Sequence, residues 1–224
     1  MLSKIILFIF RLLIIGAIIA GGIGVARFFY QQRVLEKIIT RLRADSRAAE
    51  VLVTGVNFNQ ALHKNFTTIK FLEYDTDGLP LAPKYFTFPG NVIQFQALVV
   101  RFDDRFVMAG DRLRGKSVYL FWKAFMLDGA NTKEFPINYA GDVPEGYRVK
   151  PGKDWAQELF WKDFWTYALD KKAAERLGIK NAQIEAPGAM FVPGYLYTIK
   201  IEHSGGLRID TTPLPAILHG EKVI

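Results

Sequence analysis

The sequence predicts an α+β protein. An N-terminal transmembrane helix continues into a helical stalk, and a mainly antiparallel β-sheet or sandwich domain follows with one long aromatic-rich helix packed on it. Three observations predict this fold class: an apolar run near the N-terminus, a segment rich in helix formers after it, and then short strand-like segments with glycine and proline turns around one segment of helical composition. Because strands do not alternate with helices, a doubly wound parallel sheet is not expected.

Residues 5–26 form the apolar run, and Arg11 is its only charged residue. A helix needs about 20 apolar residues to cross the hydrocarbon core of a bilayer, so the run fits one span. A cleaved signal peptide is the alternative, but its apolar region is shorter and ends at a small-residue cleavage pattern. Here the run continues into Arg27-Phe28-Phe29-Tyr30. We therefore expect an uncleaved anchor after a short tail, residues 1–4.

Basic residues on both sides of the span are expected to contact lipid headgroups. The positive-inside count places the larger domain in the cytoplasm, because most of these residues follow the span. The very short N-terminal tail favours the opposite orientation, which we adopt despite this conflict. The expected location is the inner (plasma) membrane, with the soluble domain in the periplasm or otherwise outside the cytoplasm. The headgroup residues are Lys4, Arg11, Arg27, Arg33, Lys37 and Arg41.

A stripe of small residues runs along the predicted membrane helix. Small residues at four-residue spacing let two helix backbones approach closely. The pattern predicts a helix–helix contact in the membrane, with a second copy or with a partner subunit. The alternative is that small residues are simply common in membrane helices. The stripe comprises Gly16, Ala17, Ala20, Gly21 and Gly24.

The expected stalk, residues 27–52, contains no proline or glycine. Its apolar residues recur on a heptad-like stripe, which is typical of a coiled coil, but fewer than four clean heptads are present. An amphipathic helix that lies on the membrane or against its own domain explains the pattern equally well, and both interpretations stay open. The stripe comprises Phe28, Leu35, Ile38, Leu42, Ala49 and Leu52.

The soluble domain is expected over residues 53–212, and an extended tail over residues 213–224. Alternation of apolar and polar residues between turn residues predicts its strands. The expected strands are residues 68–74, 84–88, 92–102, 117–127, 182–185, 195–203 and 207–210.

One helix is expected over residues 154–177, which contain no glycine or proline and precede Gly178, a usual helix stop. Aromatic residues crowd its first four turns, so we expect it to pack against the sheet. The same rings, with Tyr195 and Tyr197, are candidates to line a ligand groove. Such a cluster is more often core, because each ring buries a large apolar area.

The basic residues are concentrated in the expected anchor and stalk. Residues 1–50 carry eight Lys and Arg against three Asp and Glu, whereas residues 51–224 carry twenty-one against nineteen. A nucleic-acid-binding domain holds its positive charge in the folded part. We therefore expect the lipid bilayer, and not nucleic acid, as a partner. The chain has no cysteine, which excludes disulfides, thiolate metal sites and a cysteine nucleophile.

No short motif predicts catalysis or metal binding. The three histidines, His63, His203 and His219, lack the spacing of metal ligands. Residues 75–78 (DTDG) open like a calcium loop, but Leu79-Pro80-Leu81 follow where further oxygen ligands are required. We expect a turn there.

Two charged features in the middle of the chain also lack a catalytic context. Asp103, Asp104 and Asp111 are interspersed with arginines, which favours ion pairs over acid–base carboxylates. Residues 110–117 meet the GxxxxGKS spacing of a phosphate-binding loop, but the next segment alternates like a strand. Phosphate binding by such a loop needs a helix N-terminus. No catalytic, cofactor-binding or metal-binding residue is therefore assigned.

These patterns lead to the expectation of a non-enzymatic accessory or scaffold subunit in a cell-envelope complex. It would bind other protein subunits, in a homo-oligomer or a hetero-complex, through its soluble domain and membrane helix. A membrane-tethered ligand-binding or sensory domain is the alternative, and a sizeable apolar pocket with a few converging polar groups would distinguish it. A membrane-tethered hydrolase is the least favoured, because it needs clustered carboxylates or histidines in a cleft.

Overall fold

The computed structural model describes residues 2–41, 47–75, 77–102, 117–128, 131–148, 155–170, 172, 179–202 and 206–215. The chain divides into two compact units, Met1–Lys37 and Ile38–Ile224.

The N-terminal apolar segment is helical. Helix α1 spans Leu2–Arg41, and its window Phe10–Arg27 is long and apolar enough to cross a membrane. At 1.5 Å per residue, a forty-residue helix is about 60 Å long. The side chains of the whole window are exposed. The predicted N-terminal apolar helix is therefore confirmed.

The prediction that the helical stalk continues to residue 52 is wrong for the last residues of this segment. Strand β1 spans Arg47–Asn59. Its alternate residues Ala49, Val51 and Val53 are buried in the core of the domain. Burial in a sheet has overridden the helix propensity of the alanines and the glutamate at this point.

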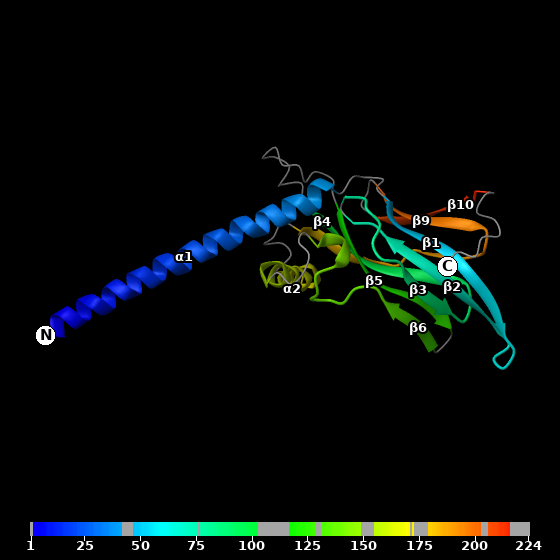
Figure 1. Ribbon diagram of the computed structural model, residues 1–224, viewed down its shortest axis with the longest axis horizontal. Coiled ribbons are helices and arrows are strands. Elements are labelled where there is room, and N and C mark those ends of the chain that lie inside the picture. Colours follow the sequence, from blue (N-terminus) through cyan, green and yellow to red (C-terminus); the bar gives the residue numbers. More distant parts are fainter. Residues whose placement is uncertain are drawn as a thin grey trace. The chain divides into compact units, whose positions relative to one another are not determined.

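The first of two sheets has the order β10-β9-β1-β2-β3, and all its neighbours are antiparallel. Figure 1 shows its strands in cyan to green and in orange to red, because it combines early and late parts of the chain. Besides β1, its strands are β2 (Lys64–Glu73), β3 (Lys84–Phe88), β9 (Tyr195–Ile201) and β10 (Leu207–Pro213).

The second sheet has the order β6-β5-β4-β7, and β8 also pairs with β4. It too is antiparallel throughout. The strands predicted at residues 84–88 and 92–102 coincide with β3 and β4, and the others overlap β2, β5, β7, β9 and β10. The strands of the second sheet are β4 (Val92–Phe102), β5 (Ser117–Asp128), β6 (Asn131–Pro136), β7 (Ile179–Glu185) and β8 (Gly188–Met190).

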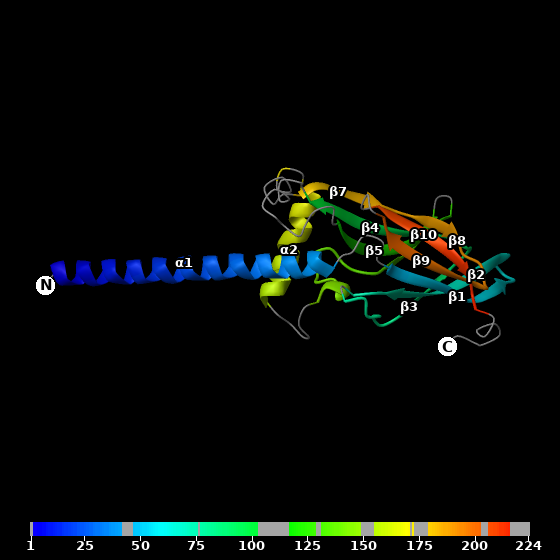
Figure 2. The same cartoon turned by 90° about the horizontal axis from the view of Figure 1, so that it is seen from above.

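Phenylalanine rings join the inner faces of the two sheets, which lie one over the other (Figure 2). Phe71 of β2 stacks on Phe95 of β4 with ring centroids 5.2 Å apart, and it meets Phe121 of β5 edge-on at 5.3 Å. At one side of the sandwich, Phe86 of β3 and Phe135 of β6 stack at 5.4 Å. The domain is thus a mainly antiparallel β-sandwich with few helices, as the coarse fold class predicts.

The long helix predicted over residues 154–177 is not shown at that length. Helix α2 spans Trp155–Leu169, and residues 171 and 173–178 lie outside the described part of the chain. Just after α2, the Asp170 carboxylate accepts a hydrogen bond from the Lys172 backbone N–H. This is the bond that an N-cap side chain accepts at the start of a helical turn, and Lys172 is itself helical. The ring of Trp165 packs against Trp122 of β5, with centroids 5.5 Å apart.

Candidate functional site

Strand β2 carries a carboxyl group into the core of the sandwich. Its inward-facing residues are Thr67, Ile69, Phe71 and Glu73, and all four are buried. The Glu73 side chain is only 3% exposed, and its Oε2 atom has no hydrogen-bond partner among the described residues. The period of two along a strand explains this placement, because Glu73 is in phase with the apolar residues before it.

Burial raises the pKa of Glu73 to about 8, while the charge of Lys84 lowers it and the charge of Glu145 raises it further. Desolvation disfavours the ionised form of a carboxyl group. Glu73 therefore holds its proton at neutral pH, which reduces the cost of placing it in the core.

A segment that includes the 3-10 helix η2, Glu145–Tyr147, lies beside Glu73. A Cβ atom built on Gly146 would lie 3.4 Å from Glu73 Oε1, so the backbone of η2 approaches the carboxyl closely. The Tyr147 hydroxyl donates a hydrogen bond to the Tyr119 carbonyl oxygen, 2.7 Å away. Burial also raises the pKa of Tyr147, which keeps the hydroxyl a neutral donor.

The same segment is tied to its surroundings by further polar contacts. Lys84 Nζ donates to the Ile137 carbonyl oxygen at 2.8 Å and lies 3.4 Å from a Glu145 carboxylate oxygen. Trp165 Nε1 on α2 donates to the Asp142 carbonyl oxygen at 3.0 Å. Glu73 is thus enclosed by a connection that β3 and α2 both hold in place.

A cavity of about 770 Å³ opens beside this connection. Its lining includes cations and anions in equal number, and Glu73 is not among the lining residues. The cavity does not have the apolar walls with a few converging polar groups that are typical of small-molecule sites. Its charged lining residues are Lys84, Arg148, Lys162, Asp142, Glu145 and Glu158.

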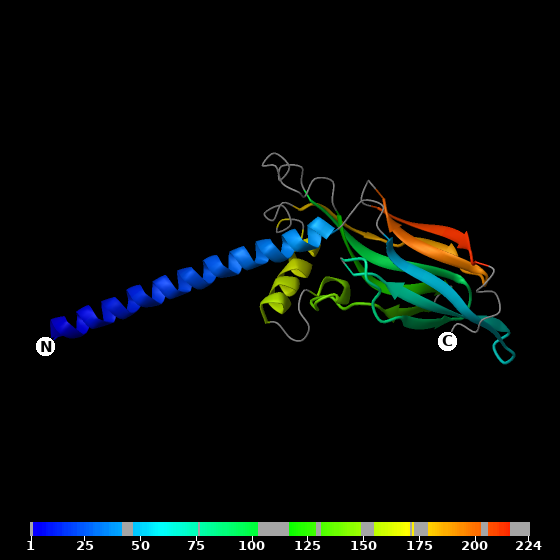
Figure 3. The same cartoon turned by 45° about the horizontal axis from the view of Figure 1, so that its top comes forward.

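The opposite end of the sandwich exposes apolar side chains on the β1–β2 hairpin. Pairing of β1 with β9 ends at Leu52, whereas β1 and β2 remain paired to Asn59. The hairpin therefore projects beyond the other strands (Figure 3). Val56 and Phe58 are 45% and 60% exposed, and Leu62 at the turn is 59% exposed. These residues form an apolar tip instead of part of the closed core.

The apolar tip adjoins a second cavity of about 420 Å³, lined in part by Val56, Thr67 and Phe191. Turns between three other strand pairs contribute to its lining. A single ion pair, between Lys64 Nζ and an Asp128 carboxylate oxygen 2.6 Å away, provides the charge there. This end of the domain therefore combines exposed apolar side chains with uncharged polar ones and one ion pair, and aromatic and apolar side chains of this kind are common at the centre of protein interfaces.

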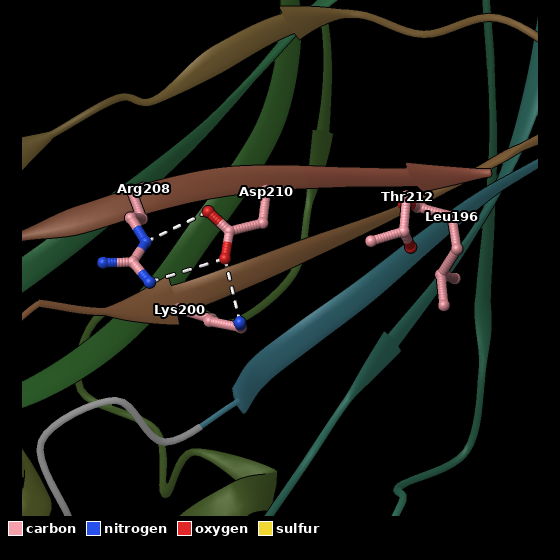
Figure 4. A network of polar contacts seen from close by, with 5 residues as sticks. All are labelled: Leu196, Lys200, Arg208, Asp210 and Thr212. Carbon is pink, nitrogen blue, oxygen red and sulfur yellow. Dashed lines mark hydrogen bonds and ion pairs between the residues drawn. The ribbon is translucent and has the colours of Figure 1, made fainter.

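A charged network marks the outer face of the first sheet (Figure 4). An Asp210 carboxylate oxygen on β10 lies 2.9 Å from Lys200 Nζ, and the other lies 3.0 Å from Arg208 Nε. Hydrogen bonds from Lys200 and then from Arg208 lower the pKa of Asp210. The three side chains are partly exposed, and an ion-pair network that solvent reaches contributes little to stability. It places charge on the edge strand β10, which discourages pairing with another chain.

The residues predicted to act in the membrane all lie on α1. The stripe Gly16, Ala17, Ala20, Gly21 and Gly24 is exposed, and a Cβ atom at each of the three glycines would meet no atom within 4 Å. The six basic residues predicted to contact headgroups, from Lys4 to Arg41, also lie on α1, where the side chains of Arg11 and Arg27 are exposed.

The expected turn at residues 75–78 is confirmed. One carboxylate oxygen of Asp75 accepts hydrogen bonds from the backbone N–H groups of Asp77 and Leu79, both at 2.8 Å, so the turn itself uses this oxygen. His63 lies on the β1–β2 turn with φ of 49°, apart from any metal-ligand cluster in the described residues. His203 and His219 lie outside the described residues.

The aspartate–arginine patch around Asp103, Asp104 and Asp111 lies outside the described residues, as does most of the GxxxxGKS pattern. Strand β5 begins at Ser117, so a strand follows the pattern where a phosphate-binding loop needs a helix. Trp161 and Trp165 are buried, which confirms the core interpretation for these two rings. The chain matches no family model, and comparisons with curated proteins and with solved structures found no match.

Two features of the candidate sites were missed from the sequence. Glu73 belongs to none of the motifs discussed above, although its alternation with Ile69 and Phe71 indicates an inward position. The apolar tip was not expected, because the first strand predicted after the stalk is residues 68–74, whereas β1 spans Arg47–Asn59. Val51, Val53, Val56 and Phe58 do recur along the segment, but a shift in register between Val53 and Gly55 breaks the simple alternation.

Proposed function

We propose that this chain is a membrane-anchored accessory or scaffold subunit of a cell-envelope protein complex. Its α1 helix anchors it by a single pass, and its sandwich domain binds partner proteins without catalysing a reaction. The observation that carries this proposal is the apolar, exposed window Phe10–Arg27, joined in one chain to a domain with an apolar tip.

The anchoring rests on the cost of leaving α1 in water. A large aliphatic side chain gains about 1.5–3 kcal/mol when it is moved from water to an apolar environment. The window holds many such side chains in exposed positions, among them Leu12, Leu13 and Ile18. A bilayer covers all sides of a helix at once, which no single groove does. The exposed small-residue stripe from Gly16 to Gly24 offers a contact for another membrane helix.

The partner binding rests on the apolar tip. Contiguous apolar surface with little charge marks an interaction site more often than a solvated face. Phe58 and Leu62 are exposed beside a cavity whose charge is confined to one ion pair. An aromatic ring next to a cavity is a common anchor of protein interfaces.

The location that goes with this role is the inner membrane, with the sandwich outside the cytoplasm. The count of basic residues on the two sides of the span opposes this orientation, so the side of the membrane requires a direct test. A reporter enzyme fused after Ile224 distinguishes the two sides, because one reporter is active only in the cytoplasm and another only outside it.

A ligand-binding or sensory domain is the second candidate, and the 770 Å³ cavity favours it. Its mixed charges and the absence of Glu73 from its lining give it less support. A titration with small zwitterionic compounds, followed by tryptophan fluorescence, to which Trp165 near the cavity contributes, tests this candidate.

The experiment for the main proposal measures the mass of the full chain purified in a mild detergent. We expect the chain to be part of a complex larger than the monomer, and the double variant Phe58→Ser with Leu62→Ser to lose most of it. Leu79→Ser is the matched control, because Leu79 is 61% exposed but lies at the other end of β2. A strictly solitary monomer, or equal loss in the control, contradicts the proposal.

A further inference from the structure

The β1–β2 hairpin leaves one edge of β1 open. On the side of β9, pairing of β1 ends at Leu52 with Leu196, and no other strand that the structure describes pairs there beyond this point. On its other side β1 is paired with β2 to the turn. The regular ladder after the register shift runs over residues 55–59, which we call the open edge. Its five residues extend about 17 Å.

Open edges of strands are templates for pairing with another chain, and proteins usually protect them with charge or proline. The other edge strands of the sandwich carry such charges, for example Arg208 and Asp210 on β10 and Lys133 and Glu134 on β6. The open edge reads Gly-Val-Asn-Phe-Asn, without a charge or a proline. It is therefore not protected against pairing.

We propose that the open edge pairs antiparallel with the open edge of a second copy of this chain, with Asn57 on the two-fold axis. The proposal rests on the proposed role in partner binding and names the partner. An isologous contact places each residue against the same surface of the other copy. Any charge on the open edge would meet a like charge nearby, and its sequence avoids this.

The register follows from the midpoint of the open edge. With Asn57 opposite Asn57 of the second copy, each Val56 lies opposite Phe58 of the other copy. Val56 and Phe58 lie on the face that continues the core, because β1 pairs them with Thr67 and Asn65 of β2. Aromatic and β-branched residues are favourable cross-strand pairs. Pairing would thus help to cover Val56 and Phe58, two of the three side chains of the apolar tip.

A register centred on Val56 is less favourable, because it pairs only residues 55–57 of the open edge. A register centred on Phe58 pairs only residues 57–59. Asn57 is therefore the centre that gives the longest ladder within the open edge.

The test uses single cysteines in the full chain, in the membranes that contain it. The chain has no cysteine of its own, so no background disulfide forms. We expect Asn57→Cys to give at least tenfold more disulfide-linked dimer on mild oxidation than Thr87→Cys. Thr87 is the matched control, because it is exposed on the edge strand β3. Thr87 pairs with Thr68 of β2, and the β2 residue that pairs with Asn57 lies on the same face of that strand.

The register is tested by mixing variants. Chains with Val56→Cys and chains with Phe58→Cys should crosslink to each other more than either does to itself. Asn57→Lys and Asn57→Glu should each weaken dimerisation of the detergent-solubilised chain at least tenfold, and mixing the two variants should restore it. Because Asn57 is exposed, these changes do not disturb the core.

The proposal is overturned if Asn57→Cys gives no more dimer than Thr87→Cys, or if mixing the lysine and glutamate variants restores nothing. If Asn57→Cys chains crosslink only after other segments of the chain have been removed, the proposal is also overturned, because the open edge would then be covered in the intact chain. The mass of the complex, measured on the same samples, separates the two proposals. A large complex without the Asn57 crosslink contradicts only the self-pairing and agrees with the proposed function.

Discussion

Replacing Glu73 by glutamine removes a buried carboxyl whose ionisation the fold opposes. In the folded domain its pKa is about 8, against an ordinary value of 4.5. Below pH 4.5 the carboxyl is protonated in both the folded and the unfolded chain, and it gives no pH dependence. Between pH 4.5 and 8 the unfolded chain ionises while the folded chain keeps its proton. The stability associated with the protonated group is therefore lost as the pH rises through this window.

The size of the effect follows from the shift. Each pH unit within the window lowers the free energy of unfolding by about 1.4 kcal/mol, and the total by pH 8 is on the order of 5 kcal/mol. Glutamine has a similar shape and does not ionise in this range. The Glu73→Gln variant should therefore become more stable relative to the unaltered chain by about 1.4 kcal/mol for each pH unit from 5 to 8.

The assay is denaturant unfolding of the full chain in a mild detergent at several pH values, followed by tryptophan fluorescence. Trp161 and Trp165 are buried and report the folded state. The Glu134→Gln variant shows the effect of removing an exposed carboxylate from β6. A stability difference between Glu73→Gln and the unaltered chain that stays constant from pH 5 to 8 refutes the reasoning, whatever its absolute value.

Three further predictions concern the same domain. Lys84→Met removes the positive charge that lowers the pKa of Glu73, so the pH at which the stability stops falling should move upward in the same unfolding series. Gly90→Ala should lower the free energy of unfolding by about 1–3 kcal/mol, because φ is 153° and the new Cβ would lie 2.8 Å from Met126 Sδ. Phe71→Ala should cost about 3–5 kcal/mol in denaturant unfolding, since it empties the centre of the core.

Strong local patterns made much of the sandwich predictable. The segment 92–102 is rich in β-branched and apolar residues after the turn at Pro89-Gly90-Asn91 and is β4, and the segment 117–127 is nearly all of β5. The apolar helix α1 was predictable from its composition alone. Strand β1 was not, because Arg47-Ala48-Ala49-Glu50 is rich in helix formers and becomes a strand only by burial between β2 and β9.

The candidate sites were less predictable, because each depends on contacts between distant segments. Burial of Glu73 requires η2, more than seventy residues later, to close over the end of β2. The open edge exists only because β9 stops opposite Leu52, and nothing in the sequence of β1 indicates where its neighbour ends. A periodic pattern specifies which face of a strand is apolar but does not specify how far the neighbouring strand extends.

The central claim is that α1 anchors the intact chain in a bilayer. Extraction of washed membranes with alkaline carbonate and with high salt, followed by sequencing of the N-terminus, tests it most directly. The account predicts that the chain stays in the membrane pellet with residues 5–26 still attached. Release of the chain into the supernatant, or a mature N-terminus beyond Tyr30, would contradict it.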